Sequence, residues 1–152
     1  MIFLIFLSRN LYAFETHQLA QSTTLSFGVH DDRIIFDISS KNSGYVAFGL
    51  APDTSMNNSE IVTITRSNGE TLLFEYEGIV GYLKAKTENG IWQIDSQSQS
   101  GSEYSVRVSR AASAAGCTIC KDIARDIPWD SRRFYIYFFR TESKQMLKGY
   151  FF

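Results

Sequence analysis

Several residue types are scarce in this 152-residue chain, and each scarcity narrows the functions open to it. Two histidines, two cysteines and two prolines are present, and the formal net charge at pH 7 is −1. Because Lys and Arg form no cluster, the chain lacks the positive surface that attracts a nucleic acid or an anionic membrane. The sequence has no Ser-His-Asp or Cys-His arrangement, no phosphate loop and no supported paired-carboxylate site. We therefore expect a non-catalytic protein that does not bind nucleic acid.

The first 20 residues are predicted to be a leader. The apolar block Met1–Leu7 is far shorter than the roughly 20 residues that span a bilayer. It is typical of a signal-peptide core that ends near Ala13 or Ala20, although the basic residues that usually precede such a core are missing. We expect residues 21–152 to be a single domain, and the mature protein to be secreted or extracytoplasmic and not membrane-spanning. A first strand or a gene-model artefact is the alternative for this block.

Beyond the leader, short apolar or alternating segments recur with turn signals between them. The expected strands are Thr23–Val29, Arg33–Ser39, Tyr45–Leu50, Glu60–Thr65, Thr71–Tyr76, Tyr82–Lys86, Ile91–Asp95, Tyr104–Ser109, Arg133–Phe139 and Lys148–Phe152. Strands at intervals of roughly 8–12 residues with almost no helix are typical of an antiparallel β-sandwich. We therefore predict an all-β sandwich of about ten short strands, with one short helix in the Arg110–Ser131 connection.

Local signals predict the turns and one close contact. His30-Asp31-Asp32, Ser67-Asn68-Gly69 and Glu88-Asn89-Gly90 each predict a hairpin, and Asn-Gly favours one because both residues accept positive φ. Gly49, inside an apolar strand, indicates close approach by a bulky neighbour.

Alternating strand directions predict which connections share an end of the sandwich. The expected group is the His30 turn, the Met56 loop, the Glu77–Gly81 turn, the Gln97–Ser102 loop and the Arg140–Met146 loop. The Asn68 turn, the Asn89 turn and the cysteine loop are expected at the other end. Greek-key crossovers would break this count.

The stretch Ser43–Val62 carries the most distinctive pattern. It contains Gly-Tyr-Val-Ala-Phe-Gly-Leu-Ala-Pro-Asp, then Met56 on a polar loop, then Ser-Glu-Ile-Val. This resembles the DOMON domain family, in which a Gly-Leu-Ser-Pro strand end, a Met loop and an Ala-Asp-Val-Val strand follow one another, with Glu60 in place of the usual Asp. The segment Tyr104–Arg110 is similar to the penultimate aromatic/Arg strand of that family, and Arg133–Phe139 followed by Lys148-Gly149 resembles its closing strands.

The resemblance implies an extracytoplasmic β-sandwich that binds b-type haem or a sugar. In haem-binding members the Met of this loop is one axial ligand and a His near the C-terminal strand is the other, so Met56 is the axial candidate here. No His stands in that C-terminal segment. The candidates for the second ligand are Lys144, Met146 and His30, and the lysine would have to be neutral and therefore buried. Met ligation implies electron transfer with a separate redox partner.

Each of these residues also has a simpler interpretation. Met56 can pack on the sandwich end as an apolar gap filler, and His30 can be a solvated turn residue. Four aromatic residues are pocket candidates, although most aromatics of a β-sandwich belong to its core: Tyr45, Phe48, Tyr82 and Trp92. The chain is then a haem-free module that recognises a sugar or a protein, or a divergent member that has lost the site.

Cys117-Thr-Ile-Cys120 holds the only two cysteines. A zinc site needs four ligands and a thioredoxin-like motif needs a βαβ context, and neither surrounds this pair. In an exported protein a local disulfide is expected, with a reactive dithiol as the alternative. Asn57-Asn58-Ser59 is a glycosylation sequon in a eukaryotic secretory route, and a glycan on Asn57 would crowd a ligand at Met56.

Overall fold

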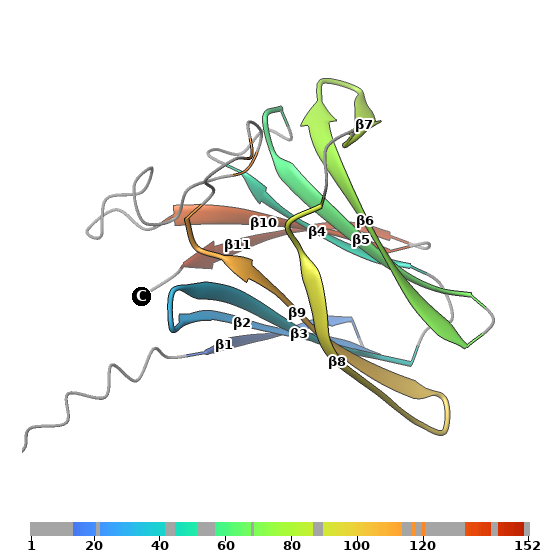
Figure 1. Cartoon of the computed structure of the whole chain (residues 1–152). Coiled ribbons are helices and arrows are strands. Elements are labelled where there is room, and N and C mark those ends of the chain that lie inside the picture. Colours follow the sequence, from blue (N-terminus) through green and yellow to red (C-terminus); the bar gives the residue numbers. More distant parts are fainter. Residues whose placement is uncertain are drawn as a thin grey trace, which may run out of the picture.

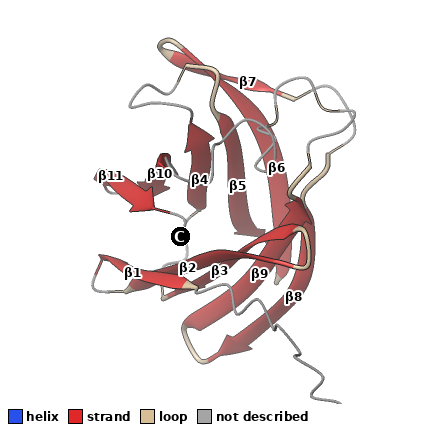
Figure 2. Ribbon diagram, turned by 90° about the vertical axis from the view of Figure 1, so that its left-hand side faces the viewer, coloured by secondary structure: helices blue, strands red, loops and turns tan. Residues whose placement is uncertain are grey.

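A computed structural model of the chain describes residues 14–20, 22–41, 45–51, 57–67, 69–86, 90–113, 117, 120, 133–140 and 143–150. These residues form two antiparallel sheets that face each other (Figure 1, Figure 2). Sheet A has the order β1-β2-β3-β9-β8, with β1 (Glu15–Ala20), β2 (Thr23–His30), β3 (Arg33–Ser40), β9 (Glu103–Ala111) and β8 (Gln93–Ser100). Sheet B has the order β11-β10-β4-β5-β6-β7, with β11 (Ser143–Tyr150), β10 (Arg133–Arg140), β4 (Val46–Ala51), β5 (Glu60–Ser67), β6 (Glu70–Ile79) and β7 (Tyr82–Ala85). The predicted antiparallel β-sandwich is confirmed.

Alternating side chains along the strands build the core between the sheets. In β3, Ile34, Phe36 and Ile38 are at most 1% exposed, whereas the residues between them are partly exposed. This is the period of two that a strand with one buried face requires. The Phe36 ring stacks on Phe48 of β4 with centroids 4.2 Å apart, and Trp92 packs edge-on against Phe48. Aromatic contacts therefore join sheet A to sheet B across the core.

Two of the predicted hairpin turns and the predicted close contact at Gly49 are present in the structure. The β2–β3 turn is Asp31-Asp32, with φ values of 48° and 58°, which is the positive-φ turn that hairpins favour. β5 and β6 pair as a hairpin around Gly69, whose φ is 83°. A Cβ atom added to Gly49 would lie 3.1 Å from Ile61 Cγ1 on β5. The predicted close approach at Gly49 is confirmed.

Two predictions between residues 86 and 102 are wrong. Gln97–Ser102 is predicted as a loop, but β8 continues to Ser100 and the chain turns only at residues 101–102. Glu88-Asn89-Gly90 is predicted as a hairpin turn, but the strands on either side lie in different sheets. β8 is an edge strand whose side chains are almost all exposed, so hydrophobic periodicity could not reveal its length.

The crossing between β7 and β8 also changes which connections share an end. We call the end with the β2–β3 turn the Asp31 end, and the end with the β5–β6 turn the Gly69 end. The Ala112 N–H donates to Asp32 O at 2.7 Å, so the segment toward the cysteines leaves β9 at the Asp31 end. The β8–β9 and β10–β11 turns lie at the Gly69 end. The predicted ends of these three connections are therefore wrong, because β7 and β8 run in the same direction.

Residues 15–20, inside the expected leader, form the edge strand β1. Glu15 pairs with Phe27 and Ala20 with Thr23, and the His17 ring stacks on Phe27 with centroids 5.6 Å apart. Cleavage near Ala13 would keep this strand, whereas cleavage near Ala20 would remove it.

The helix expected between Arg110 and Ser131 falls mainly on residues outside the described ranges. Within those ranges, Ala111 ends β9 and Ala112 and Ser113 form a bend. No helix in the described part of the chain is long and apolar enough to cross a membrane.

The aromatic core predicts a large difference between two Phe→Ala variants. Phe36 is 0% exposed and Phe74 on β6 is 45% exposed. We expect Phe36→Ala to lower the free energy of unfolding by about 3–5 kcal/mol, because a buried ring leaves a cavity. Phe74→Ala is the matched control and should cost about 0.5 kcal/mol. Urea unfolding measures both, and equal losses would contradict the assignment of the core.

Candidate functional site

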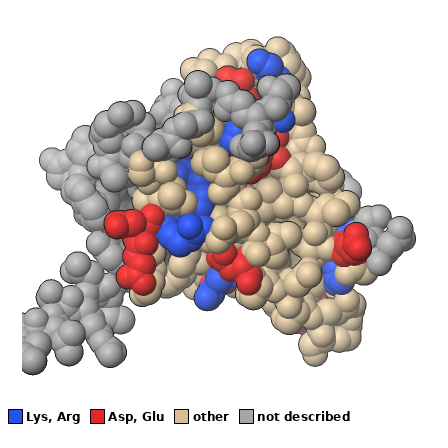
Figure 3. Space-filling view, in the orientation of Figure 1, with Lys and Arg blue, Asp and Glu red and all other residues tan. Residues whose placement is uncertain are grey.

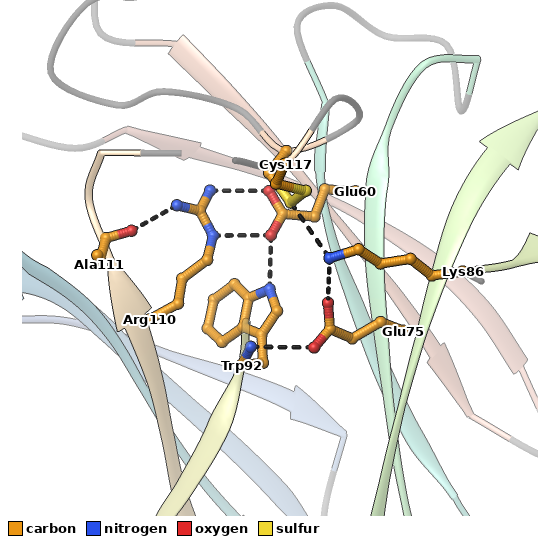
Figure 4. Close-up of a disulfide and its surroundings, with 8 residues drawn as sticks. Glu60, Glu75, Lys86, Trp92, Arg110, Ala111 and Cys117 are labelled. Atoms are coloured by element: carbon orange, nitrogen blue, oxygen red, sulfur yellow. Dashed lines mark hydrogen bonds and ion pairs between the residues drawn. A yellow bond between two sulfur atoms is a disulfide. The ribbon is translucent and has the colours of Figure 1, made fainter. Parts of the chain in front are cut away.

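Glu60, the first residue of β5, places its carboxylate in the interior at the Asp31 end (Figure 4). Arg110 of β9 donates from Nε to Glu60 Oε1 at 2.7 Å and from Nη2 to Oε2 at 2.8 Å. The Trp92 indole N–H donates to Oε1 at 2.5 Å. Glu60 is 2% exposed and Arg110 0% exposed. This bidentate pair joins sheet B to sheet A, and its hydrogen bonds offset the cost of burying both charges.

A second buried ion pair lies next to the first and reaches the disulfide (Figure 4). Lys86 Nζ donates to Glu75 Oε2 at 2.9 Å, and both side chains are at most 7% exposed. The Trp92 backbone N–H donates to Glu75 Oε1 at 3.0 Å. Lys86 Nζ also lies 3.7 Å from Cys120 Sγ, which is bonded to Cys117. The expected disulfide is therefore present.

We call Glu60, Arg110, Trp92, Glu75 and Lys86 the buried network. Its acidic and basic groups are matched to one another, and the Arg110 guanidinium lies over the Trp92 ring at 5.3 Å from the centroid. Arg110 Nη1 donates to Ala111 O at 2.6 Å. The network therefore holds the two sheets and the disulfide segment together. The described residues contain no group of three or more His, Cys, Asp or Glu that could hold a metal ion.

Met56, the predicted axial ligand, lies outside the described residues. The chain on either side of its segment is placed at the Asp31 end, with Ala51 at the end of β4 and the Asn57 sequon residue before β5. The Asn58 N–H donates to Gly78 O and the Gly78 N–H donates to Ser59 O, both at 2.8 Å.

The predicted aromatic pocket residues do not gather in one place. Phe48 and Trp92 belong to the core cluster. Tyr45 is 38% exposed before β4 at the Gly69 end, and Tyr82 is 59% exposed at the start of β7. His30 is the exposed last residue of β2, next to the β2–β3 turn, with Nδ1 3.1 Å from an Asp31 carboxylate oxygen.

The strand register places the backbone of the other two ligand candidates. Lys144 pairs with Phe139, which pairs with Ala47, and Met146 pairs with Tyr137, which pairs with Gly49. At about 3.3 Å per residue, Lys144 lies roughly 13 Å and Met146 roughly 7 Å along the strand from the level of Ala51, where the chain leaves toward Met56. Lys144 is therefore nearer the Gly69 end.

These positions test whether a haem would fit. Arg110, Glu60 and Trp92 are buried against one another between the sheets at the Asp31 end. The described residues therefore do not fit a haem between the two sheets at the end where the Met56 segment begins.

The outer face of sheet A carries a polar hollow that the sequence did not predict. Its volume is about 440 Å³, and β2, β3, β9 and β8 line it. Two cross-strand rows meet there. The Ser39 row is Gln18, Thr24, Ser39, Ser105 and Ser98, and the Asp37 row is Thr16, Ser26, Asp37, Arg107 and Ser96. Eight of these ten side chains are neutral, and seven of the eight carry a hydroxyl group, so the face is rich in hydroxyls.

Asp37 and Arg107 form the charged centre of this hollow. Arg107 donates from Nε to Oδ1 at 2.7 Å and from Nη2 to Oδ2 at 2.8 Å, with side chains 47% and 34% exposed for Arg107 and Asp37. The Asp37 carboxylate raises the pKa of Arg107 above its ordinary value, first by this hydrogen bonding and then by its charge. So exposed a pair adds little stability. It does present a fixed donor and acceptor array to solvent.

Charged side chains on the face shown in Figure 3 lie in small groups, several of them of mixed sign, between wide uncharged areas.

No protein-family model matches the chain, and a comparison with curated protein sequences finds no match.

The buried network predicts that removing one of its charges is costly. We expect Glu60→Gln to lower the free energy of unfolding by about 3–5 kcal/mol, because Arg110 would keep a buried charge without its anion. Asp37→Asn breaks a similar bidentate pair at the surface and should cost about 1 kcal/mol or less.

A double variant separates charge from packing in the same measurement. Glu60→Gln with Arg110→Met removes both charges and keeps an acceptor for the Trp92 indole, so it should be more stable than Glu60→Gln alone. Urea unfolding of the three variants provides the comparison, and equal costs for Glu60→Gln and Asp37→Asn would contradict a structural role for the network.

Proposed function

We propose that this chain is a non-catalytic recognition module of an extracytoplasmic compartment, and that it binds a neutral sugar chain on the outer face of sheet A. The observation that carries the proposal is the alignment of the Ser39 row and the Asp37 row across five strands. The resemblance to the DOMON family includes sugar binding among its implications, which supports the same function.

The chemistry of the two rows suits a polyhydroxyl ligand. Neighbouring strands lie about 4.8 Å apart, so each row presents hydrogen-bonding groups at a regular spacing comparable to the length of a sugar ring. Ser105 donates to Ser39 at 3.2 Å and Ser39 donates to Glu103 at 2.6 Å, which orients these hydroxyls. A hydroxyl still has acceptor capacity when it donates, so a ligand hydroxyl can bind to it. The hollow provides the concave surface that such a ligand needs.

The disulfide supports the proposed compartment. Disulfides persist in oxidising environments and are rare in the cytosol. The Cys117–Cys120 bond is formed, and the described residues contain no free cysteine. Secretion through a leader is consistent with this state.

Sugar binding is tested by calorimetric titration with a panel of neutral hexose oligosaccharides. We expect Asp37→Ala/Arg107→Ala to weaken the affinity of the best oligosaccharide about tenfold or more, because charge-assisted hydrogen bonds are lost. Removing both partners avoids leaving an unpaired charge. Glu77→Ala/Lys84→Ala is the matched control, since this surface ion pair, 3.9 Å apart, lies on sheet B. No binding, or equal weakening by both double variants, would refute the proposed surface.

Haem with electron transfer to a separate redox partner is the second candidate, favoured by the resemblance around Met56. Our proposal expects that the purified chain reconstituted with haem shows only the absorption spectrum of free haem, in the oxidised and in the reduced state. A sharp Soret band with resolved reduced bands, lost in Met56→Ala, would overturn that expectation. Lys144→Ala and Met146→Ala would then identify the second ligand.

A further inference from the structure

The disulfide has an asymmetric environment that a simple staple does not need. Cys117 is partly exposed, whereas Cys120 is 9% exposed. Lys86 Nζ lies 3.7 Å from Cys120 Sγ and is itself held by Glu75. One sulfur is therefore more open to solvent, and the other has a buried ammonium group beside it.

A staple of this size would also contribute little to folding. The two cysteines are three positions apart in the sequence, so the loop that their bond closes is very short. In the chain-entropy description, stabilisation by a disulfide grows with the length of the closed loop. The small contribution of this disulfide to the stability of the fold therefore does not explain why a buried lysine lies beside one of its sulfurs.

We infer that Cys117–Cys120 is a thiol–disulfide exchange site that accepts electrons from a dithiol, with Cys117 as the attacked sulfur and Cys120 as the leaving sulfur. The geometry that carries this is the exposure of Cys117 combined with the Lys86 ammonium beside Cys120. The inference does not rest on the proposed sugar binding, because the sugar would bind on the outer face of sheet A and not beside the disulfide and Lys86.

The exchange proceeds in two balanced steps. A thiolate of the partner dithiol bonds to Cys117 Sγ, the Cys117–Cys120 bond breaks, and Cys120 leaves as a thiolate. The second thiolate of the partner then attacks the partner's sulfur atom of the mixed disulfide. This forms the partner's disulfide and releases Cys117 as a thiolate. The partner is oxidised to a disulfide, this chain is reduced to a dithiol, and the two protons of the partner end on Cys117 and Cys120.

Lys86 acts on the leaving sulfur in this scheme. Thiol–disulfide exchange is faster when the leaving thiolate is more stable, and a neighbouring lysine stabilises a thiolate. Glu75 keeps Lys86 in place through the 2.9 Å ion pair, while the Trp92 backbone N–H occupies the other Glu75 oxygen. The ammonium group therefore retains donors that can face Cys120.

The first experiment measures how fast dithiothreitol reduces the full oxidised chain at neutral pH, by gel shift after maleimide labelling. We expect Lys86→Met to be reduced about tenfold more slowly than the unaltered chain. Lys84→Met is the matched control, since this lysine is 60% exposed on β7, two positions before Lys86, and it should leave the rate unchanged. Equal rates for Lys86→Met and the unaltered chain would overturn the role of Lys86.

A second variant guards against misfolding. Lys86→Met leaves Glu75 buried without its cation, so Lys86→Met/Glu75→Gln removes both charges and keeps an acceptor for the Trp92 N–H. Near-ultraviolet circular dichroism confirms that each variant is folded. The double variant should also be reduced about tenfold more slowly. Reduction at the unaltered rate in a folded double variant would overturn the inference.

The position of attack gives an independent readout. The oxidised chain is mixed with reduced glutathione and quenched with N-ethylmaleimide, and the modified peptides are identified by mass spectrometry. We expect glutathione on Cys117 and maleimide on Cys120. Glutathione mainly on Cys120, or no adduct in the folded protein, would show a structural disulfide only.

Discussion

The placement of one buried carboxylate constrains most of this structure. Glu60 stands at the start of β5 in sheet B, and its two oxygens are held by Arg110 from sheet A and by the Trp92 indole from the crossing segment. A buried charge without a partner is far more costly than a mispacked apolar side chain, because its hydration is lost and nothing replaces it. The sheets can therefore pack only in the alignment that brings these three side chains together. Hydrophobic burial drives the sheets together, and the alignment that they adopt is one in which this buried pair is formed.

This constraint also bears on where we propose that the molecule binds a ligand. Matched charges and the Trp92 ring are buried between the sheets at the Asp31 end, and the recognition surface that we propose lies on the outside of the sandwich. On sheet A, outward positions carry hydroxyls and one exposed ion pair, and the sheet is hollowed there. At the same end as Glu60, the network continues to Lys86 and the disulfide, which places a sulfur pair beside a buried cation. The proposed recognition surface and the proposed exchange site are therefore separate surfaces of one scaffold.

Two residues that carry the resemblance to the DOMON family contact each other in this structure. Glu60 follows the Met56 segment and Arg110 closes the strand similar to the penultimate one of that family, and the two residues bind each other although 50 positions separate them. Residues that carry the resemblance are therefore used to assemble the two sheets. The fold that the pattern implies is confirmed, whereas the ligand that it implies stays a prediction, because a fold does not by itself specify a function.

The positions of most strands followed from the sequence. Apolar alternation around Phe36 and Ile38, the run ending at Leu50, and the Asn-Gly turn before β6 are local signals that the tertiary structure keeps, whereas the same Asn-Gly signal at Asn89 lies between two sheets. β8 was misjudged for a physical reason. Its side chains are polar on both faces because it is an exposed edge strand, and a strand without a buried face has no hydrophobic period.

The sequence by itself determined the fold class, the β2–β3 and β5–β6 hairpins and the presence of a cysteine pair, because each depends on residues close together in the chain. Only the tertiary structure decided that Glu60 meets Arg110, that Lys86 lies beside Cys120, and that Asp37 and Arg107 centre a polar hollow. These contacts depend on strand order and on the crossing between β7 and β8, which bring together residues 34 to 70 positions apart. No local pattern specifies such pairings, since they arise from how two sheets bury their apolar faces against each other.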